Sequence, residues 1–185
     1  MSTHIRKKKI GIAVAIILAV AVALGIFRGG GSKGMDTYSS GDFQVSFSYP
    51  ENYMLSEMDI DTTHRVHHQI LLADEDAMRT IPKNGEGPTA ITVDVLQNDL
   101  DHQSARDFVT GTSWSNYKLG DGRIASTTYG SLSGLQYGWS GLYEGRSFAV
   151  STPGWIYLFS VTYDAPGDQI LADFDKVVRS ARISF

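Results

Sequence analysis

The sequence contains no cysteine in its 185 residues. This absence excludes disulfide bonds, thiol nucleophiles, zinc–thiolate sites and the lipidated cysteine that anchors bacterial lipoproteins. If the folded part of the chain lies outside the cytosol, its hydrophobic core must stabilise it without covalent cross-links.

Motifs of nucleotide binding and nucleophilic catalysis are also missing. The chain has no P-loop, the glycine-rich pattern that holds nucleotide phosphates. Segment 129–145, YGSLSGLQYGWSGLYEG, has serines among glycines, but no five residues fit G-x-S-x-G. We interpret these glycines as marks of bulges, turns and close packing between strands, and we expect no enzyme activity.

Basic residues are scarce in most of the chain. All 20 acidic residues follow residue 28, whereas five of the 16 basic residues lie at or before it, which leaves 11 basic against 20 acidic residues and a net charge of −9. Nucleic acid and anionic lipid both repel such a domain. We therefore expect no nucleic-acid partner. The same charge is compatible with a cationic or metal-bearing partner.

One long uncharged segment is present, and it lies near the N-terminus. Residues 10–27 form an apolar run of 18 residues, which as a helix is roughly 27 Å long and matches the hydrocarbon core of a bilayer. The basic tail, residues 1–9, holds four consecutive basic residues and stays cytoplasmic by the positive-inside rule. The sequence thus predicts a single-pass transmembrane anchor in the cell membrane, with the N-terminus cytoplasmic and the C-terminal domain extracytoplasmic.

Two alternatives compete with this anchor. A cleaved signal peptide also has a basic start and an apolar middle, and Ala21-Val22-Ala23 fits its cleavage pattern, although this triplet lies inside the apolar run. A helix buried in a protein core is the other alternative. The anchor and the signal peptide both place the following domain outside the cytoplasm.

The anchor is followed by a linker and then by one domain. Residues 28–36, RGGGSKGMD, form a Gly-rich linker with an end-to-end span of roughly 15–18 Å. Residues 37–185 remain, and their number suits one well-packed domain better than two.

The domain is predicted to consist mostly of β-strands. In segment 43–49, Phe43, Val45, Phe47 and Tyr49 alternate with polar residues, which predicts a half-buried strand whose rings face the core. This strand should end at Pro50, because proline cannot continue a ladder. Further strands are expected at 65–73, 89–97, 123–129, 135–140, 146–151 and 155–163.

The last two predicted strands form a hairpin. They flank Thr152-Pro153-Gly154, where proline followed by glycine predicts a type II turn. Strand 155–163 has apolar residues on both of its faces, which is typical of a central strand.

Two helices are expected. Segment 168–185, DQILADFDKVVRSARISF, has apolar residues at helical spacing, with acidic residues early and basic residues late. A shorter helix covers 103–110 and stops at Gly111. Between the strands, segment 74–88 is polar without a period, and we interpret it as a loop that can carry a binding function.

The order of these segments resembles PsbP-like domains over about residues 37–185. The resemblance rests on the Tyr-Pro-Glu-Asn-Tyr turn at 49–53, the Ser-Ala-x-x-Phe helix at 104–108, an aromatic strand near the end, and the closing segment 180–185, which is similar to the Ser-Phe-x-Phe ending of that family. The resemblance implies an α+β fold in which helices sandwich an antiparallel β-sheet, a PsbP-like α/β/α sandwich.

The resemblance also suggests a setting for the domain. The best-known relatives are extrinsic subunits of photosystem II, which bind at the membrane surface and support calcium and chloride retention. This chain departs from them in having its own apparent anchor, so the photosynthetic role is not carried over. No binding residue of the family matches securely enough to transfer.

A histidine cluster is the candidate for metal chemistry. Segment 59–68, DIDTTHRVHH, contains His64, His67 and His68 beside two aspartates. On a strand, His64 and His68 share a face about 13 Å apart and His67 points the other way, so no pair chelates one ion easily. A helix would bring the three together, but the neighbouring Thr and Val residues favour an extended chain. These histidines are the candidate metal ligands. Asp59 and Asp61 are a second pair that can hold calcium, but the full acidic spacing of a calcium loop is absent. No cofactor is expected.

The aromatic residues between 129 and 157 allow two interpretations, because they can line a ligand groove or pack in the core and the sheet. They are Tyr129, Tyr137, Trp139, Tyr143, Trp155 and Tyr157. Packing explains them more simply.

Two functions follow from these observations. The first is a membrane-tethered, non-enzymatic domain that binds a partner protein or supports a membrane complex. The alternative is a small-ligand or metal-binding module of the cell envelope, with the three histidines and the loop 74–88 as its elements.

Overall fold

The computed structural model describes residues 34–62, 64–81 and 86–184. The predicted anchor at 10–27, the basic tail at 1–9 and most of the linker at 28–36 lie outside these ranges. Within them, the elements in chain order are β1 (Met35–Ser40), β2 (Val45–Pro50), β3 (Tyr53–Asp61), β4 (His67–Asp74), α1 (Glu75–Arg79), β5 (Ala90–Gln97), α2 (Ala105–Gly111), the 3₁₀-helix η1 (Tyr117–Leu119), β6 (Ala125–Tyr129), β7 (Leu132–Ser140), β8 (Glu144–Ser151), β9 (Trp155–Tyr163), α3 (Gln169–Ser180) and β10 (Arg182–Ile183).

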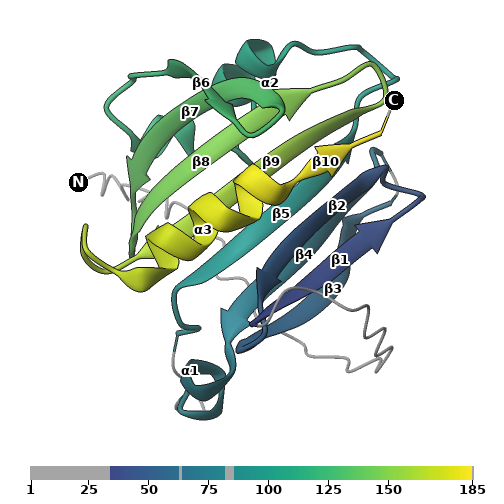
Figure 1. The fold of residues 1–185 in the computed structure, drawn as a ribbon. Helices are drawn as coiled ribbons and strands as arrows, with labels where there is room; N and C mark the ends of the chain where they lie inside the picture. The colour runs from purple at the N-terminus through teal and green to yellow at the C-terminus, as the bar shows by residue number, and fades with distance from the viewer. Residues whose placement is uncertain (1–33, 63, 82–85, 185) are drawn as a thin grey trace, which may run out of the picture.

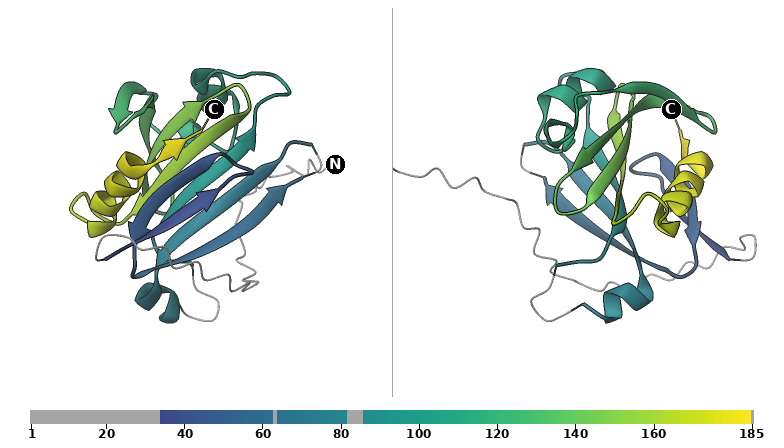
Figure 2. Two further views of the ribbon diagram at one scale, coloured as in Figure 1. Left: turned by 45° about the vertical axis from the view of Figure 1, so that its right-hand side comes forward. Right: turned by 90° about the vertical axis from the view of Figure 1, so that its left-hand side faces the viewer.

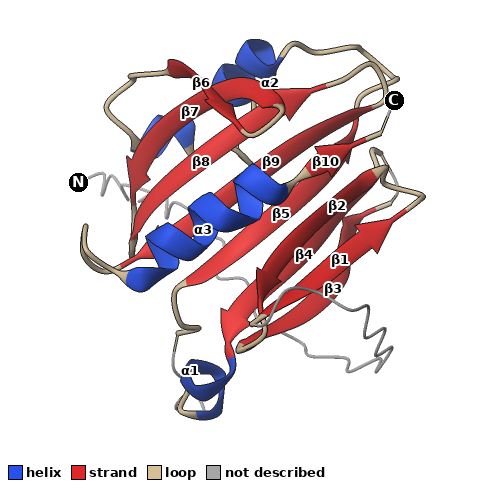
Figure 3. Ribbon diagram, in the orientation of Figure 1, coloured by secondary structure: helices blue, strands red, loops and turns tan. Residues whose placement is uncertain are grey.

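The strands form two antiparallel sheets (Figures 1 and 3). The large sheet has seven strands in the order β3-β4-β5-β9-β8-β7-β6, and the small sheet has the order β1-β2-β10. As the sequence predicts, β9 is a central strand and forms a hairpin with β8, in which Phe148 lies opposite Phe159. The architecture is therefore mostly antiparallel β-sheet with a few helices.

The two faces of the large sheet are covered differently. One face, called the first face below, lies under α3 and the small sheet, which sit side by side in a single layer (Figure 1). The opposite face, the second face, is covered by α2 and η1 over β7 and β8 (Figure 2). The α/β/α sandwich is thus only an approximation, because one outer layer is half helix and half sheet.

The first face holds the larger core cluster. Alternate residues of the central strands point into it, among them Val93, Phe148, Tyr157 and Phe159, all fully buried. Helix α3 adds Phe174 and its neighbours from the apolar stripe at helical spacing. Segment 43–49 contributes as predicted, although Phe43 lies in the turn before β2 and packs on the core from there.

The second face holds a smaller cluster, formed by the other alternate residues of the same strands. Leu96, Ile156 and Leu158 pack there with Phe108 and Val109 of α2. Helix α2 begins where the Ser104 side chain accepts a hydrogen bond from the Asp107 backbone N–H.

Several boundaries differ from the sequence predictions, each for a local reason. Met35 and Asp36, predicted as linker, pair with the end of β2 in β1. The loop 74–88 contains the short helix α1, because the Asp74 carboxylate accepts hydrogen bonds from two backbone N–H groups and caps it. Strand β3 is not among the predicted strands.

The predicted type II turn between β8 and β9 is wrong. Positive φ among the described glycines occurs at Gly34, Gly122 and Gly130, so Gly154 lacks the conformation that this turn requires. The Trp155 N–H instead donates to the Thr152 hydroxyl, at 3.0 Å. The side chain of Thr152 therefore takes the place of a backbone acceptor.

Within the described ranges, no helix is both long and apolar enough to span a membrane.

Candidate functional site

His67 and His68 are neighbours on β4 and point to opposite faces of the large sheet. This arrangement follows from strand geometry, because successive side chains alternate between faces. His68 stacks on Phe43 at the first face, and His67 meets Trp114 at the second face. The predicted opposition of the two side chains is confirmed.

His68 lies between two carboxylates. Its Nδ1 is 2.8 Å from Asp59 Oδ1 and its Nε2 is 2.9 Å from Glu57 Oε2. Each of the two ring nitrogens therefore faces a carboxylate oxygen at hydrogen-bond distance. The ring also stacks on Phe43, with centroids 4.3 Å apart. This cluster therefore fixes the turn before β2 against β3 and β4.

Tyr38 extends the same cluster, since its hydroxyl donates to Glu57 Oε2 at 2.9 Å. Burial, followed by the charge of Glu57, raises the pKa of Tyr38 well above its ordinary value. The phenol therefore stays a neutral hydrogen-bond donor.

His67 belongs to a more deeply buried cluster. Its side chain is 3% exposed and its Nε2 lies 2.8 Å from Asp94 Oδ1, which also accepts a hydrogen bond from Gln69 Nε2 at 2.8 Å. Its Nδ1 is buried and has no hydrogen-bond partner among the described residues. Trp114 packs edge-on against the ring, with centroids 4.6 Å apart.

The three candidate metal ligands do not converge. His64 is 87% exposed and lies beside Asp61, at 3.5 Å, before β4 begins. His67 and His68 are engaged on opposite faces by separate carboxylates. In the part of the chain that the structure describes, no three His, Cys, Asp or Glu side chains gather to hold a metal ion.

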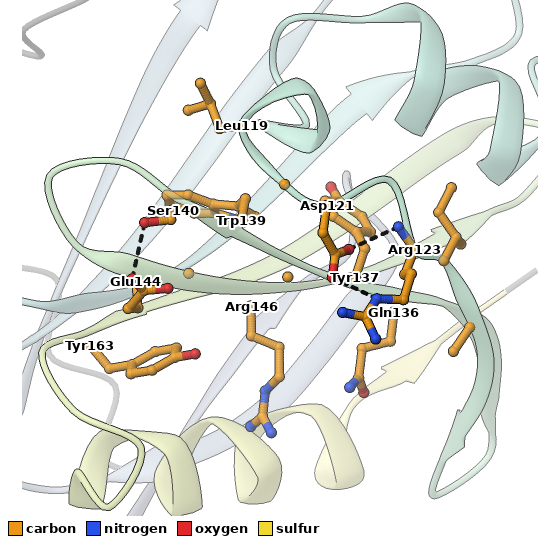
Figure 4. A pocket seen from close by; sticks show the side chains of 15 residues that line it. Leu119, Asp121, Arg123, Gln136, Tyr137, Trp139, Ser140, Glu144, Arg146 and Tyr163 are labelled. Atoms are coloured by element: carbon orange, nitrogen blue, oxygen red, sulfur yellow. Dashed lines mark hydrogen bonds and ion pairs between the residues drawn. The ribbon is translucent and has the colours of Figure 1, made fainter.

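An open groove of about 730 Å³ lies at the β7 end of the large sheet (Figure 4). It lies between the loop from Leu119 to Ala125 and the β7–β8 hairpin, with Tyr163 at the end of β9 on its far side. The loop approaches β7 closely at Gly120, where an added Cβ would overlap the carbonyl oxygen of Gly138. Glycine at position 120 therefore sets how near the loop lies to the strand.

The apolar wall of the groove has one exposed side chain and one that is held by a hydrogen bond. Leu119 is 54% exposed. Trp139 is half-buried, and its Nε1–H donates to Ser147 Oγ at 2.9 Å, which holds the indole in place. The sequence signal for this wall is weak, because Leu119 stands alone in the polar run KLGDG.

Charged side chains surround this wall. Arg123 bonds Asp121 at 2.6 Å, while Arg146 turns toward α3 and bonds Asp175 at 2.7 Å (Figure 4). The Arg123 backbone N–H, followed by its guanidinium, lowers the pKa of Asp121. Glu144 accepts a hydrogen bond from the Ser140 hydroxyl at 3.0 Å.

The predicted aromatic residues divide between core and groove. Tyr157 is fully buried, and Tyr137 is buried and donates its hydroxyl to the Ser115 carbonyl at 2.8 Å. Trp139 and the edge of Tyr137 line the groove. Packing thus explains most of these residues, as expected, and Trp139 both packs on the second-face cluster and lines the groove.

Comparisons with known proteins identify the fold. No protein-family model matches the sequence, and a search of curated proteins finds no match. The structure is similar to the solution structure of cyanobacterial PsbP (CyanoP) from Synechocystis sp. PCC 6803, with a TM-score of 0.55 and 14% identity over 87% of this chain and 99% of that one. The chain therefore has a PsbP-like fold.

Proposed function

We propose that this chain is a non-enzymatic domain that binds a partner protein or supports a membrane complex. In this proposal residues 10–27 anchor it in the cell membrane and the folded part lies outside the cytoplasm. The observation that carries the proposal is the set of large apolar side chains at the surface: Leu100 (58% exposed), Trp114 (48%), Leu119 (54%) and Leu142 (67%).

The position of these side chains matters more than their number, because single exposed apolar residues are common on monomers. Leu119 lines the groove, and Gly141 of the neighbouring hairpin lies beside it, next to Leu142. Apolar side chains that gather at a hollow are typical of interaction sites. The PsbP-like fold supports the same function, since the best-known relatives suggested by the sequence are extrinsic subunits bound at a membrane surface.

The histidine clusters support a non-enzymatic function. Among the described residues, neither His67 nor His68 is hydrogen-bonded to a serine, threonine or tyrosine hydroxyl. Nucleophilic catalysis by a hydroxyl needs such a pair. The same clusters do not favour the metal-binding alternative, because each histidine is already bonded to a carboxylate of its own.

The test of partner binding is a pull-down from solubilised membranes with the full anchored chain. We expect one protein to be recovered reproducibly and in proportion to the bait. The control bait is the same chain after heat unfolding, which displays the anchor without the folded surface. Equal recovery by both baits, or no recovery, would count against the proposal.

The absence of cysteine allows a direct test of membrane topology. Ser39→Cys places one thiol on an exposed position of β1, and Thr3→Cys places one in the basic tail. We expect a membrane-impermeant maleimide to label Ser39→Cys on intact cells, and Thr3→Cys only after the membrane is opened. The reverse pattern would contradict the orientation.

A further inference from the structure

We propose that the outer edge of β3 binds an extended segment of the partner protein in which basic and apolar residues alternate. In this complex the basic side chains lie beside Glu57 and Asp59, and the apolar side chains lie beside Met54 and Met58. This inference rests on the proposed function, and it adds a contact at the opposite edge of the large sheet from the groove.

The first argument is the unpaired edge of β3. This strand is the outermost of the large sheet and pairs on one side, with β4 (Figure 1). Its nine residues make it the longest of the strands at the sheet edges in the described structure, against five residues in β6 and six in β1. Among the described helices and strands, β4 alone has extensive backbone contact with it.

The backbone of this edge can form a further ladder. Residues 53–59 run against β4 without a register shift, which comes only between Asp59 and Asp61. Apart from the ladder to β4, no backbone–backbone hydrogen bond among the described residues involves this stretch. It is roughly 20 Å long. Every second residue of an antiparallel strand directs its N–H and C=O to the same side, so roughly three or four residues present these groups outward to an added strand.

The second argument is the alternation of side chains along this edge. Glu57 and Asp59 point to the first face, where both contact His68. Met54 and Met58 therefore point to the second face, because successive side chains alternate, and both are half-buried. The helices that cover the second face lie over β7 and β8, on the far side of the sheet. An added strand thus meets carboxylates on one face and methionine side chains on the other.

The third argument is charge. The side chains of Glu57 and Asp59 are 43% and 61% exposed. The hydrogen bonds of the described structure use one oxygen of each carboxylate, Glu57 Oε2 and Asp59 Oδ1, which leaves the other oxygen of each for a cation. One imidazole carries at most one positive charge, so two carboxylates keep this edge negative. The net charge of −9 beyond residue 28 favours the same sign of partner.

These charges also disfavour a second copy of the chain at this edge. In an antiparallel pair of two β3 strands in full overlap, Glu57 lies opposite the same residue of the other copy. Like charges directly opposite each other destabilise a sheet, whereas opposite charges stabilise it. Charged side chains commonly protect an edge strand from self-association, and here they also select the charge of the bound segment.

The experiment uses the full chain in detergent micelles, labelled with nitrogen-15, and three capped peptides, KVKVKV, EVEVEV and KKKVVV. The second peptide reverses the charge, and the third keeps the composition but loses the alternation. We expect KVKVKV to shift the amide signals of residues 53–59 and to slow hydrogen exchange at every second one of them. The two control peptides should leave these amides unchanged.

Matched variants test the side-chain contacts. Met58→Ser should weaken KVKVKV binding about threefold, because it removes apolar surface from the edge. Leu142→Ser, at an exposed leucine of the β7–β8 hairpin, should leave binding unchanged. Asp59→Asn should weaken binding about threefold at low salt, whereas Glu144→Gln, which removes a carboxylate at the groove, should not. The remaining amide signals show whether each variant is folded.

Several results would overturn the inference. These are equal effects of the three peptides, shifts confined to other amides, no binding at millimolar peptide, or equal effects of Met58→Ser and Leu142→Ser. Slow exchange at every second residue of 53–59 outside the ladder to β4, before any peptide is added, would also overturn it. A second copy or another segment of the chain would then occupy the edge.

The failure of this inference differs from the failure of the proposed function. Met58→Lys places a cation where the bound segment has an apolar side chain. If this variant recovers as much of the membrane partner as the wild-type chain, the function stands and the edge assignment fails. If KVKVKV binds as expected but no partner is recovered, the edge chemistry stands and the partner function fails.

Discussion

The two faces of the seven-stranded sheet are built from the same strands but differ in chemistry. The first face buries a continuous set of rings and aliphatic side chains beneath α3 and the small sheet, with Phe148 and Phe159 fully buried. The second face buries polar side chains beside its smaller apolar cluster, among them Asp94 and Ser147. The first face supplies most of the apolar burial, whereas the second face depends on satisfied hydrogen bonds.

Neighbouring histidines show this difference for single residues. His68, at the first face, has a carboxylate at each ring nitrogen. His67, at the second face, has one carboxylate and one buried nitrogen without a partner in the described structure. The two histidines are adjacent on one strand, yet different groups hydrogen-bond to them, because their side chains point to opposite faces of the sheet.

The largest expected effect tests the first face. Phe148→Ala should lower the free energy of unfolding by about 3–5 kcal/mol, because it leaves a cavity between Tyr129 and Phe159. Urea denaturation at neutral pH measures this loss. The control is Leu142→Ala at an exposed position, which should change stability by less than about 0.5 kcal/mol. Similar losses for both variants would contradict the assignment of the main core to the first face.

The next effect tests the buried polar groups of the second face. Asp94→Ala should cost about 1–3 kcal/mol of unfolding free energy, because it leaves the Nε2 groups of His67 and Gln69 without an acceptor. Thermal unfolding by circular dichroism provides the measurement. Asp94→Asn keeps an acceptor oxygen and should cost less, so an equal loss in both variants would show that the hydrogen bonds are not what stabilises this face.

A glycine at the groove tests how tightly the β7–β8 hairpin is packed. Gly145→Ala should cost about 1–3 kcal/mol, because a Cβ there would overlap the Trp139 ring and displace it from Ser147. Gly154→Ala is the control, since a Cβ at that position meets no other atom within 4 Å. Urea midpoints and tryptophan fluorescence follow both changes. The prediction is wrong if the two variants are equally stable.

The smallest expected effect at neutral pH concerns a tyrosine of the first face. Tyr157→Phe removes the hydrogen bond from the hydroxyl to the Phe43 carbonyl, 2.9 Å long, and should cost about 0.5–1.5 kcal/mol. Burial raises the pKa of Tyr157 to about 12, above the value of about 10 in an unfolded chain.

This raised pKa fixes the sign of the pH dependence. The contribution of the neutral phenol is fully present below about pH 10 and is lost as the pH rises toward the folded value of about 12. The unfolding free energy of the wild-type chain should therefore fall over this window, and that of Tyr157→Phe should fall less steeply. Tyr38, Tyr53 and Tyr137 also have raised pKa values and keep part of the slope. Parallel curves for the two proteins would rule out a contribution from Tyr157.

Sequence reasoning succeeded where the signal is local. Strand β9 was predicted at 155–163 because apolar residues on both faces mark a central strand, and α3 was predicted because its apolar residues recur at helical spacing. It missed most of β3, whose acidic residues suggest exposure. The Glu57 and Asp59 side chains are instead held by His68 from the next strand.

The candidate site was the part least accessible to prediction. The sequence selected three histidines that lie close together in the chain, but strand alternation separates His67 from His68 and the bend before β4 leaves His64 exposed. The groove gathers Leu119, Trp139, Glu144 and Tyr163 from four segments. No local pattern marks that combination.

The sequence by itself determined the absence of thiol chemistry, the acidic charge beyond residue 28 and the alternation that makes strands, because each depends only on composition or near neighbours. Tertiary structure alone decided that α3 and the small sheet share one layer, and that β7 extends past β6 to where the Gly120 backbone lies against Gly138. These features depend on strand register and on contacts between residues far apart in the chain, which periodicity does not specify.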